Sequence, residues 1–128
     1  VDKEEDIEKE VEAHVLFLLH EYDKSSKVNC FYLNSMPLWL DKDTRVGLLL
    51  RFQAEKAAGK SETTLWIGGT SIPLSIDNGI QILYALEVYA SECYDNTAKH
   101  EANIKSLAAS EDKVNYDITV GYPTKLQF

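Results

Sequence analysis

Cysteine is scarce in this sequence, which contains two cysteines, Cys30 and Cys93, and no CxxC pair. Their apolar surroundings favour two buried free thiols over a disulfide, and both arrangements are compatible with cytoplasmic production. Methionine is scarcer still: Met36 is the single methionine, and the chain begins at Val1. We therefore expect the chain to be the C-terminal part of a longer protein, or a processed piece of one.

Basic residues are also few, with 13 Lys and Arg against 21 Asp and Glu, which gives a formal net charge of −8. No cluster of basic residues stands out, so the phosphates of a nucleic acid would be repelled on average, and nucleic acid is not an expected partner. No apolar run reaches the roughly 18 residues needed to span a bilayer. The acidic N-terminus does not fit a signal peptide, so a membrane is not an expected partner either.

The overall composition is that of an ordinary folded domain, with 45% hydrophobic and 27% charged residues in 128 residues. This length suffices to bury a substantial core without disulfides or metals. We predict a single domain over residues 1–128.

The stretch from 75 to 108 predicts one long helix with two different halves. From Ile80 to Ala90 the sequence is apolar on almost every side, so this half should be covered on several faces. The second half keeps one apolar stripe at alternating spacings of four and three residues, which is typical of a helix facing a single partner. That stripe consists of Leu86, Ala90, Cys93, Thr97, His100, Ile104 and Leu107.

The first segment, residues 1–24, predicts an amphipathic helix with acidic first turns. Its stripe of Ile7, Val11, Val15, Leu18 and Tyr22 is narrow and suits packing against another helix. We predict that it packs antiparallel along the second half of the long helix, with Ile7 near Ile104 or Leu107. His14 and His100 would then border the same seam.

After the first helix come two hairpin-helix (ββα) units, predicted over residues 28–59 and 64–108, and the helix of the second unit is the long helix. Asn34-Ser35 and Gly68-Gly69 are the expected hairpin turns, and Asp41 and Ser75 the expected N-caps. The two units align without a gap at an offset of 34, but identities are few, so duplication and chance convergence both stay open. The two hairpins could pair into one small sheet or lie separately on the helices.

A tail over residues 109–128 completes the predicted fold. It begins with a brief helical turn capped by Ser110, and Gly121 and Pro123 exclude a regular helix after it. The fold class is therefore α+β and mainly helical: an N-terminal helix, two ββα units around a long central helix, and a small antiparallel sheet. In its core we expect Leu49, Trp66, Leu83 and Leu86 to be almost fully buried.

The sequence contains no GxSxG, P-loop, HExxH or GxGxxG motif. Cys93 and His100 share one helix face, but roughly 10 Å of helical rise separates them, and they supply two of the three or four ligands that a metal needs. No catalytic, cofactor-binding or metal-binding residue is therefore predicted, and no small-molecule ligand.

Nine residues are candidates for structural or contact roles. Arg45 follows Asp41 and Asp43 at a helix start, where a cation opposes the helix dipole, so we expect it to bond a carboxylate or backbone carbonyls. A structural salt bridge is favoured over a ligand-binding arginine. His100 should have a hydrogen-bond partner in the helix seam. The remaining candidates are large rings that could line a binding face, although packing is their usual role: Trp39, Trp66, Tyr94, Tyr116 and Tyr122.

Several segments together resemble an uncharacterised domain family found in prophage proteins of gut bacteria, often in or beside tail-region proteins. The most specific are WLDKDTRVGL and LEVYASECYDNTAKH, supported by YDITVGYP, and the resemblance covers about residues 22–128. It implies a phage structural or tail-associated role without a known activity, and it supplies no catalytic or ligand-binding residues.

The function expected from these observations is non-enzymatic: assembly through contacts with other phage structural proteins or with copies of itself. The expected location is the bacterial cytoplasm during assembly, and then the virion. Two alternatives stay open. One is a soluble assembly chaperone or adaptor, and the other is an enzyme with a site between the hairpins and the central helix.

Overall fold

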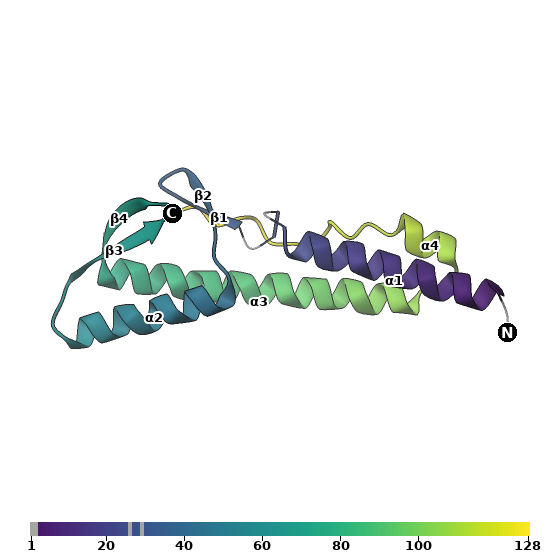
Figure 1. Ribbon diagram of the computed structural model, residues 1–128, viewed down its shortest axis with the longest axis horizontal. Coiled ribbons are helices and arrows are strands. Elements are labelled where there is room, and N and C mark those ends of the chain that lie inside the picture. The colour runs from purple at the N-terminus through teal and green to yellow at the C-terminus, as the bar shows by residue number, and fades with distance from the viewer. Residues whose placement is uncertain (1–2, 26, 29) are drawn as a thin grey trace. The chain divides into compact units, whose positions relative to one another are not determined.

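The computed structural model describes residues 3–25, 27–28 and 30–128. The predicted ranges 1–24 and 28–59 include residues 1, 2 and 29, which lie outside the described residues. The order of the elements is helix α1, hairpin β1–β2, helix α2, hairpin β3–β4 and helices α3 and α4 (Figure 1). Their bounds are α1 Lys3–Asp23, β1 Cys30–Leu33, β2 Met36–Trp39, α2 Lys42–Ala57, β3 Glu62–Ile67, β4 Thr70–Ser75, α3 Ile76–Ser106 and α4 Ser110–Asn115. The mainly helical α+β class is confirmed.

The described chain forms two compact units that share α3. The first, the helical unit, comprises residues up to Cys30 together with Tyr89–Lys125, and the second, the hairpin unit, comprises Phe31–Val88 and Leu126–Phe128. The single domain expected over residues 1–128 stays a prediction, and the two units are described separately below.

In the hairpin unit, local sequence signals place the turns and helix starts where they were predicted. Both turns have positive φ at both central residues: Asn34 and Ser35 in β1–β2, and Gly68 and Gly69 in β3–β4. This is the conformation that matches the twist of a two-residue hairpin. Asp41 accepts a hydrogen bond from the Thr44 backbone N–H, and Ser75 accepts one from that of Asn78. The helices therefore begin at residues 42 and 76, at the predicted offset of 34.

The two hairpins form separate two-stranded sheets within the described residues. In the β3–β4 pair, Ile67 lies opposite Thr70 and Leu65 opposite Ile72. Each hairpin contributes apolar side chains to a common core with α2 and α3, in which Phe31, Phe52 and Ile76 are almost inaccessible to solvent. Of the two arrangements that the sequence left open, the structure shows hairpins that do not pair with each other.

The predicted core residues of this unit are partly correct. Leu83 and Leu86 are each 3% exposed, as expected, whereas Leu49 is half-buried. Trp66 was wrongly assigned to the core, because it is 66% exposed. Side chains alternate across a strand, and Thr63 and Leu65 occupy the buried face of β3, so Trp66 points to the other face.

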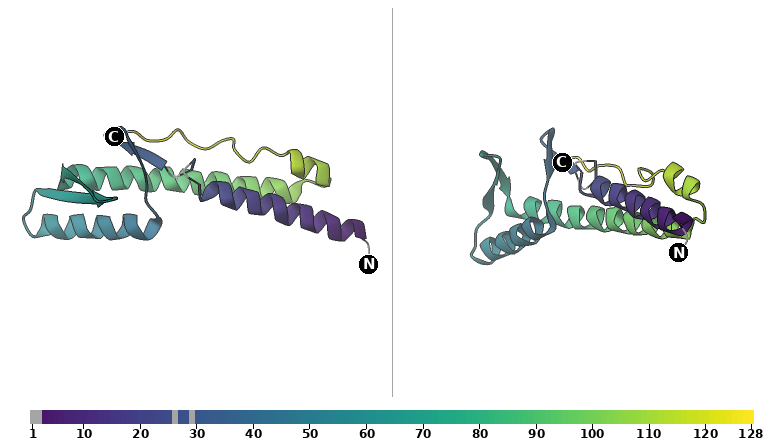
Figure 2. Two further views of the ribbon diagram at one scale, coloured as in Figure 1. Left: turned by 45° about the horizontal axis from the view of Figure 1, so that its top comes forward. Right: turned by 45° about the vertical axis from the view of Figure 1, so that its right-hand side comes forward.

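In the helical unit, α1 runs antiparallel beside the second half of α3 (Figures 1 and 2). Val15, Leu19 and Ile104 form its buried apolar cluster, flanked by Val11 and Tyr116. Ile7 and Leu18, which were predicted to face α3, are exposed instead. The buried row runs through residues 11, 15 and 19, and Leu18 lies about 100° of helical rotation away from Leu19.

Three further predictions concern residues of this unit. His14 is exposed whereas His100 is buried, and the expected seam bordered by both histidines stays a prediction. Cys93 and Cys30 are both buried, as expected. Ser110 begins α4 rather than capping it, because Ala109 occupies the N-cap position without a side-chain cap.

Candidate functional site

Arg45, at the start of α2, is held by two hydrogen bonds within the hairpin unit. Its side chain is almost fully buried, and its Nε donates a hydrogen bond of 2.9 Å to Oε1 of Glu87 on α3. Its Nη1 donates another of 2.7 Å to the carbonyl oxygen of Leu40. The predicted carboxylate and carbonyl partners are both confirmed, and with these contacts Arg45 ties α2 to α3.

The two acidic residues beside Arg45 have other roles. The hydrogen bonds from Thr44, the backbone one first, lower the pKa of Asp41, and the nearby Arg45 lowers it further. Asp43 lies exposed in the first turn of α2, where the helix dipole favours a negative charge. Neither carboxylate is the hydrogen-bonded partner of Arg45. That partner is Glu87, which lies 42 positions farther along the chain.

His100 is the centre of a buried polar network in the helical unit. It is 4% exposed, and its Nε2 lies 2.7 Å from the carbonyl oxygen of Val120, which can only accept, so Nε2 donates. Its Nδ1 lies 2.6 Å from the Tyr116 hydroxyl, which itself accepts from Asn103 and can therefore donate its proton to Nδ1. Because both ring nitrogens have partners, His100 retains no free nitrogen for a metal or a substrate.

A second set of hydrogen bonds in this network connects α3 with α1 and with the segment after α4. The Thr97 hydroxyl donates to Asp23 at 2.9 Å, so it accepts from the Tyr122 hydroxyl at 2.6 Å. Burial raises the pKa of Tyr122 above its ordinary value of 10.0. Tyr122 also packs against the rings of Tyr22 and His100. This arrangement attaches three chain segments to one another.

Replacement of Tyr122 by phenylalanine should therefore lower stability and change its alkaline pH dependence. Loss of the hydrogen bond to Thr97 should cost about 0.5–1.5 kcal/mol at neutral pH. Because the folded state raises the phenol pKa, this group's contribution is fully present below pH 10.0 and is lost as the pH rises from there through the folded-state pKa. The variant should lack that part of the alkaline loss in urea unfolding measured at successive pH values.

A matched control for this prediction is Tyr94→Phe, because Tyr94 lies on α3 in the same unit and is highly exposed. It should match the wild-type protein at every pH. A Tyr122→Phe variant with wild-type stability and an unchanged alkaline profile would show that the bond to Thr97 does not form in solution.

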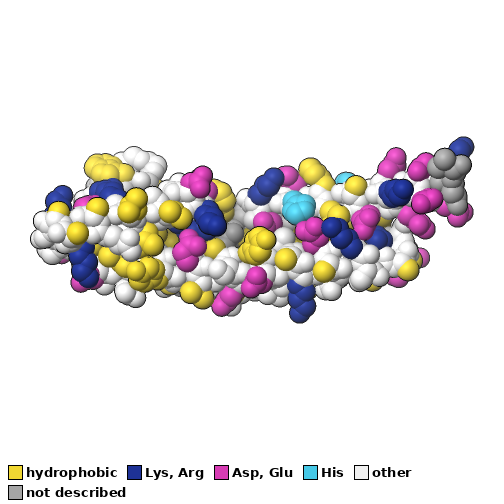
Figure 3. All heavy atoms as spheres, turned by 90° about the horizontal axis from the view of Figure 1, so that it is seen from below, with side chains coloured by type: hydrophobic (Ala, Val, Ile, Leu, Met, Phe, Trp, Pro, Cys, Tyr) yellow, Lys and Arg dark blue, Asp and Glu magenta, His cyan; other side chains and the backbone are white. Residues whose placement is uncertain are grey.

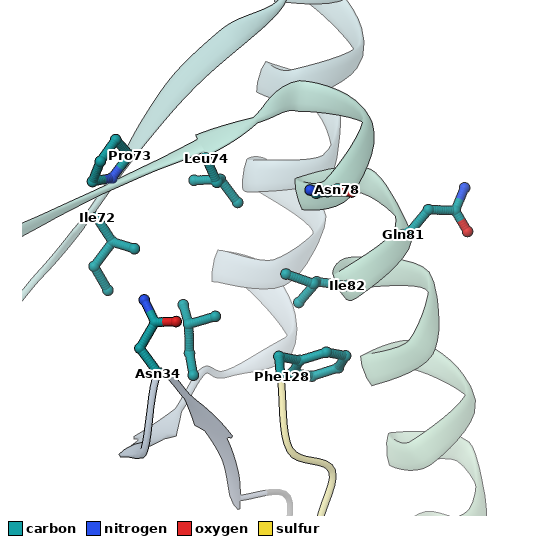
Figure 4. Close-up of a pocket in the computed structure, with 9 residues that line it drawn as sticks. Asn34, Ile72, Pro73, Leu74, Asn78, Gln81, Ile82 and Phe128 are labelled. Atoms are coloured by element: carbon teal, nitrogen blue, oxygen red, sulfur yellow. The ribbon is translucent and has the colours of Figure 1, made fainter.

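The hairpin unit contains a cavity of about 390 Å³ between the hairpin residues and the first turns of α3 (Figure 4). No charged side chain and no histidine is among the residues that line it, so its lining side chains offer no general base. Three carboxamides supply its polar groups, and the other walls are apolar. The lining residues are Leu33, Asn34, Ile72, Pro73, Leu74, Asn78, Gln81, Ile82 and Phe128.

Two features are absent from the part of the chain that the structure describes. No group of three or more His, Cys, Asp or Glu side chains is placed to hold a metal ion among those residues. Within the same residues, no helix combines the length and the apolar character needed to cross a membrane.

The most distinctive surface of the hairpin unit is an exposed apolar face on its two helices. Val46 and Leu50 are spaced four apart on α2, and Tyr84 and Val88 are spaced four apart on α3; we call these four residues the helical apolar face. Their side chains are between 46% and 67% exposed. Figure 3 shows hydrophobic side chains gathered over α2 and the first half of α3.

The ion pairs between α2 and α3 explain why these four residues come together. Arg45 pairs with Glu87 near one end of α2, and Lys56 pairs with Asp77 at 2.7 Å near the other. The two helices therefore run antiparallel in a register that sets Val46 beside Val88 and Leu50 beside Tyr84. Because i,i+4 residues share one helix face, the four side chains form one strip.

The sequence did not single out this strip, although it contained a signal. The first half of α3 is apolar nearly all round and was expected to be covered on several faces. Tyr84 and Val88 remain exposed instead. Of the predicted contact residues, Trp39, Trp66 and Tyr94 are exposed, whereas Tyr116 and Tyr122 belong to the His100 network.

Comparison with known proteins found no family model, no curated protein and no solved structure that matches this chain. The resemblance to a prophage domain family therefore stays a prediction.

Proposed function

We propose that this chain is a non-enzymatic structural module of a prophage-derived particle and that it acts in assembly through protein–protein contacts. The observation that carries the proposal is the helical apolar face. When a helix has more apolar faces than the rest of its fold covers, the uncovered apolar surface is available to bind a partner. The prophage context comes from the resemblance of WLDKDTRVGL and LEVYASECYDNTAKH, which include the start of α2 and the middle of α3.

Two observations favour a contact role over catalysis. The cavity of the hairpin unit has no titratable side chain in its lining, and His100 uses both ring nitrogens in hydrogen bonds that hold the fold. The partners in this proposal are other structural proteins of the particle or further copies of the chain. The module would reside in the bacterial cytoplasm during assembly and in the virion afterwards.

The test is incorporation into particles. We expect mass spectrometry of particles purified from a lysogen that carries this gene to find the chain at a constant ratio to the other structural proteins. Leu50→Glu places a charge in the helical apolar face and should abolish incorporation, because an unpaired charge is costly to bury in an interface.

The control variant is Trp66→Glu, which changes an equally exposed apolar residue on β3 outside the helical apolar face. It should incorporate like the wild-type protein, and circular dichroism should show both variants folded. Absence of the chain from mature particles that require it for their assembly would contradict the structural role and favour the assembly chaperone. Equal incorporation of both variants would exclude the helical apolar face as the contact.

A further inference from the structure

The extended segment Leu126–Phe128, which we call the docked segment, lies along one edge of β1. The Tyr32 backbone N–H donates to the carbonyl oxygen of Leu126 at 2.9 Å, and the Phe128 N–H donates to that of Tyr32 at 2.7 Å. The Asn34 N–H donates to the carbonyl oxygen of Phe128 at 3.1 Å. Tyr32 and Gln127 form a parallel bridge. The docked segment thus adds a short parallel strand to the β1–β2 hairpin.

Side chains of the docked segment alternate between the core and the solvent. Leu126 packs against the core of the hairpin unit, and Gln127 is exposed. Phe128 makes an edge-to-face contact with the buried Phe31, with 6.1 Å between ring centroids, but remains 39% exposed. It also forms one wall of the cavity (Figure 4). The docked segment is therefore held on β1 by backbone hydrogen bonds and by two apolar side chains. A peptide that adds a strand to an open sheet edge is bound in the same way.

The chain that leads into the docked segment makes it separable from the rest. Residues 123–125 contain no helix or strand, and they follow Tyr122, which is hydrogen-bonded to Thr97 on α3. They belong to the helical unit, whereas Leu126–Phe128 belong to the hairpin unit. The segment is three residues long, and neither of its two apolar side chains is fully buried, so few contacts hold it. Without it, the edge of β1 would expose unpaired backbone groups at Tyr32 and Asn34, which is the condition under which sheet edges capture other strands.

We propose that this edge of β1 is an acceptor site for the docked segment of a second copy of this chain. The hydrogen bonds and the Phe128–Phe31 contact are the same whether the segment comes from the same copy or another. Exchange therefore loses no contact, which is the usual basis of strand and domain swapping. At high concentration two copies would exchange docked segments and form a dimer. This proposal does not rest on the phage role or on the helical apolar face.

The test uses two single-cysteine additions that can bond only across copies. One preparation carries Tyr32→Cys and the other Gln127→Cys, the two positions that face each other in the parallel bridge. The two chains are refolded together at increasing concentration and then mildly oxidised. We expect a covalent heterodimer whose yield rises with protein concentration. The native Cys30 and Cys93 are buried and should contribute little background.

Two controls make the result decisive. A single chain with both substitutions should close an internal disulfide at low concentration, which tests the pairing itself. Gln127→Cys mixed with Ser71→Cys, an exposed residue on β4, measures random collision. In addition, an excess of a peptide of residues 122–128 should lower the heterodimer yield several-fold, whereas the same peptide with Phe128→Ala should have little effect.

The proposal is overturned if the doubly substituted chain closes internally but the mixed chains give no more dimer than the collision control. It is also overturned if the doubly substituted chain does not close, because the docked segment would then not lie on β1. Dimer formation that the peptide cannot lower would equally contradict it, since the acceptor edge would not be the site of contact.

Discussion

The Leu86→Ala variant is expected to lose about 2–5 kcal/mol of unfolding free energy, which is the usual range for removing a buried leucine side chain. Leu86 is 3% exposed and belongs to the core that both hairpins form with α2 and α3. The three carbons that alanine lacks would leave a cavity among packed neighbours that cannot fully close. Urea or guanidinium unfolding followed by circular dichroism would measure the loss.

Trp66→Ala is the matched control for this prediction, because it removes a larger apolar side chain from the same unit. Since Trp66 is 66% exposed, we expect its replacement to change the unfolding free energy by about 0.5 kcal/mol or less. A reversed order, with Trp66→Ala the more damaging variant, would mean that β3 presents its opposite face to the helices. That result would contradict the register of the β3–β4 hairpin.

Gly79→Ala is expected to destabilise the protein by about 1–3 kcal/mol, the usual cost of overpacking a core. Gly79 lies in the first turn of α3, and a Cβ atom there would be 2.8 Å from Cε2 of Phe52 and 3.2 Å from Cδ1 of Leu74. Phe52 is 2% exposed and belongs to the core of the hairpin unit, so its ring is surrounded by other side chains. The clash should therefore outweigh the gain of about 1 kcal/mol that alanine usually brings to a helix.

Gly47→Ala, in α2, should have the opposite sign. A Cβ atom at Gly47 would have no neighbour within 4 Å among the described residues, so the helix-propensity gain of about 0.5–1 kcal/mol should appear undiminished. The two variants compared by chemical denaturation separate packing from propensity. If both raised stability, α3 would not approach Phe52 as closely as the structure shows.

The features predicted correctly from the sequence depend on residues that are close together in the chain. Asp41 and Ser75 cap helices because each side chain reaches an N–H three residues ahead. Gly68-Gly69 forms a hairpin turn because glycine adopts positive φ without steric cost. Asn34-Ser35 adopts the same turn, and asparagine tolerates positive φ better than most residues. These local rules account for the helix starts and for the offset of 34 between the two ββα units.

Only the tertiary structure decided which side chains on these elements find a partner. The sequence indicated that Arg45 needs a carboxylate, but Glu87 becomes that partner through the packing of α2 on α3. The sequence likewise placed His100 in a helix seam, and the path of residues 116–122 brought Tyr116 and Val120 to its ring nitrogens.

The same distinction explains the predictions that failed. Apolar periodicity identifies a helix or strand and marks the residues that can be buried, but it does not reveal how far neighbouring elements extend over each face. Leu18 and Leu19 are both apolar, and the rotation of α1 about its axis left Leu18 exposed. Tyr84 and Val88 looked like core residues, and the hairpin unit left them on its surface. Hydrophobicity sets the tendency toward burial, whereas actual burial depends on which surfaces the folded chain brings together.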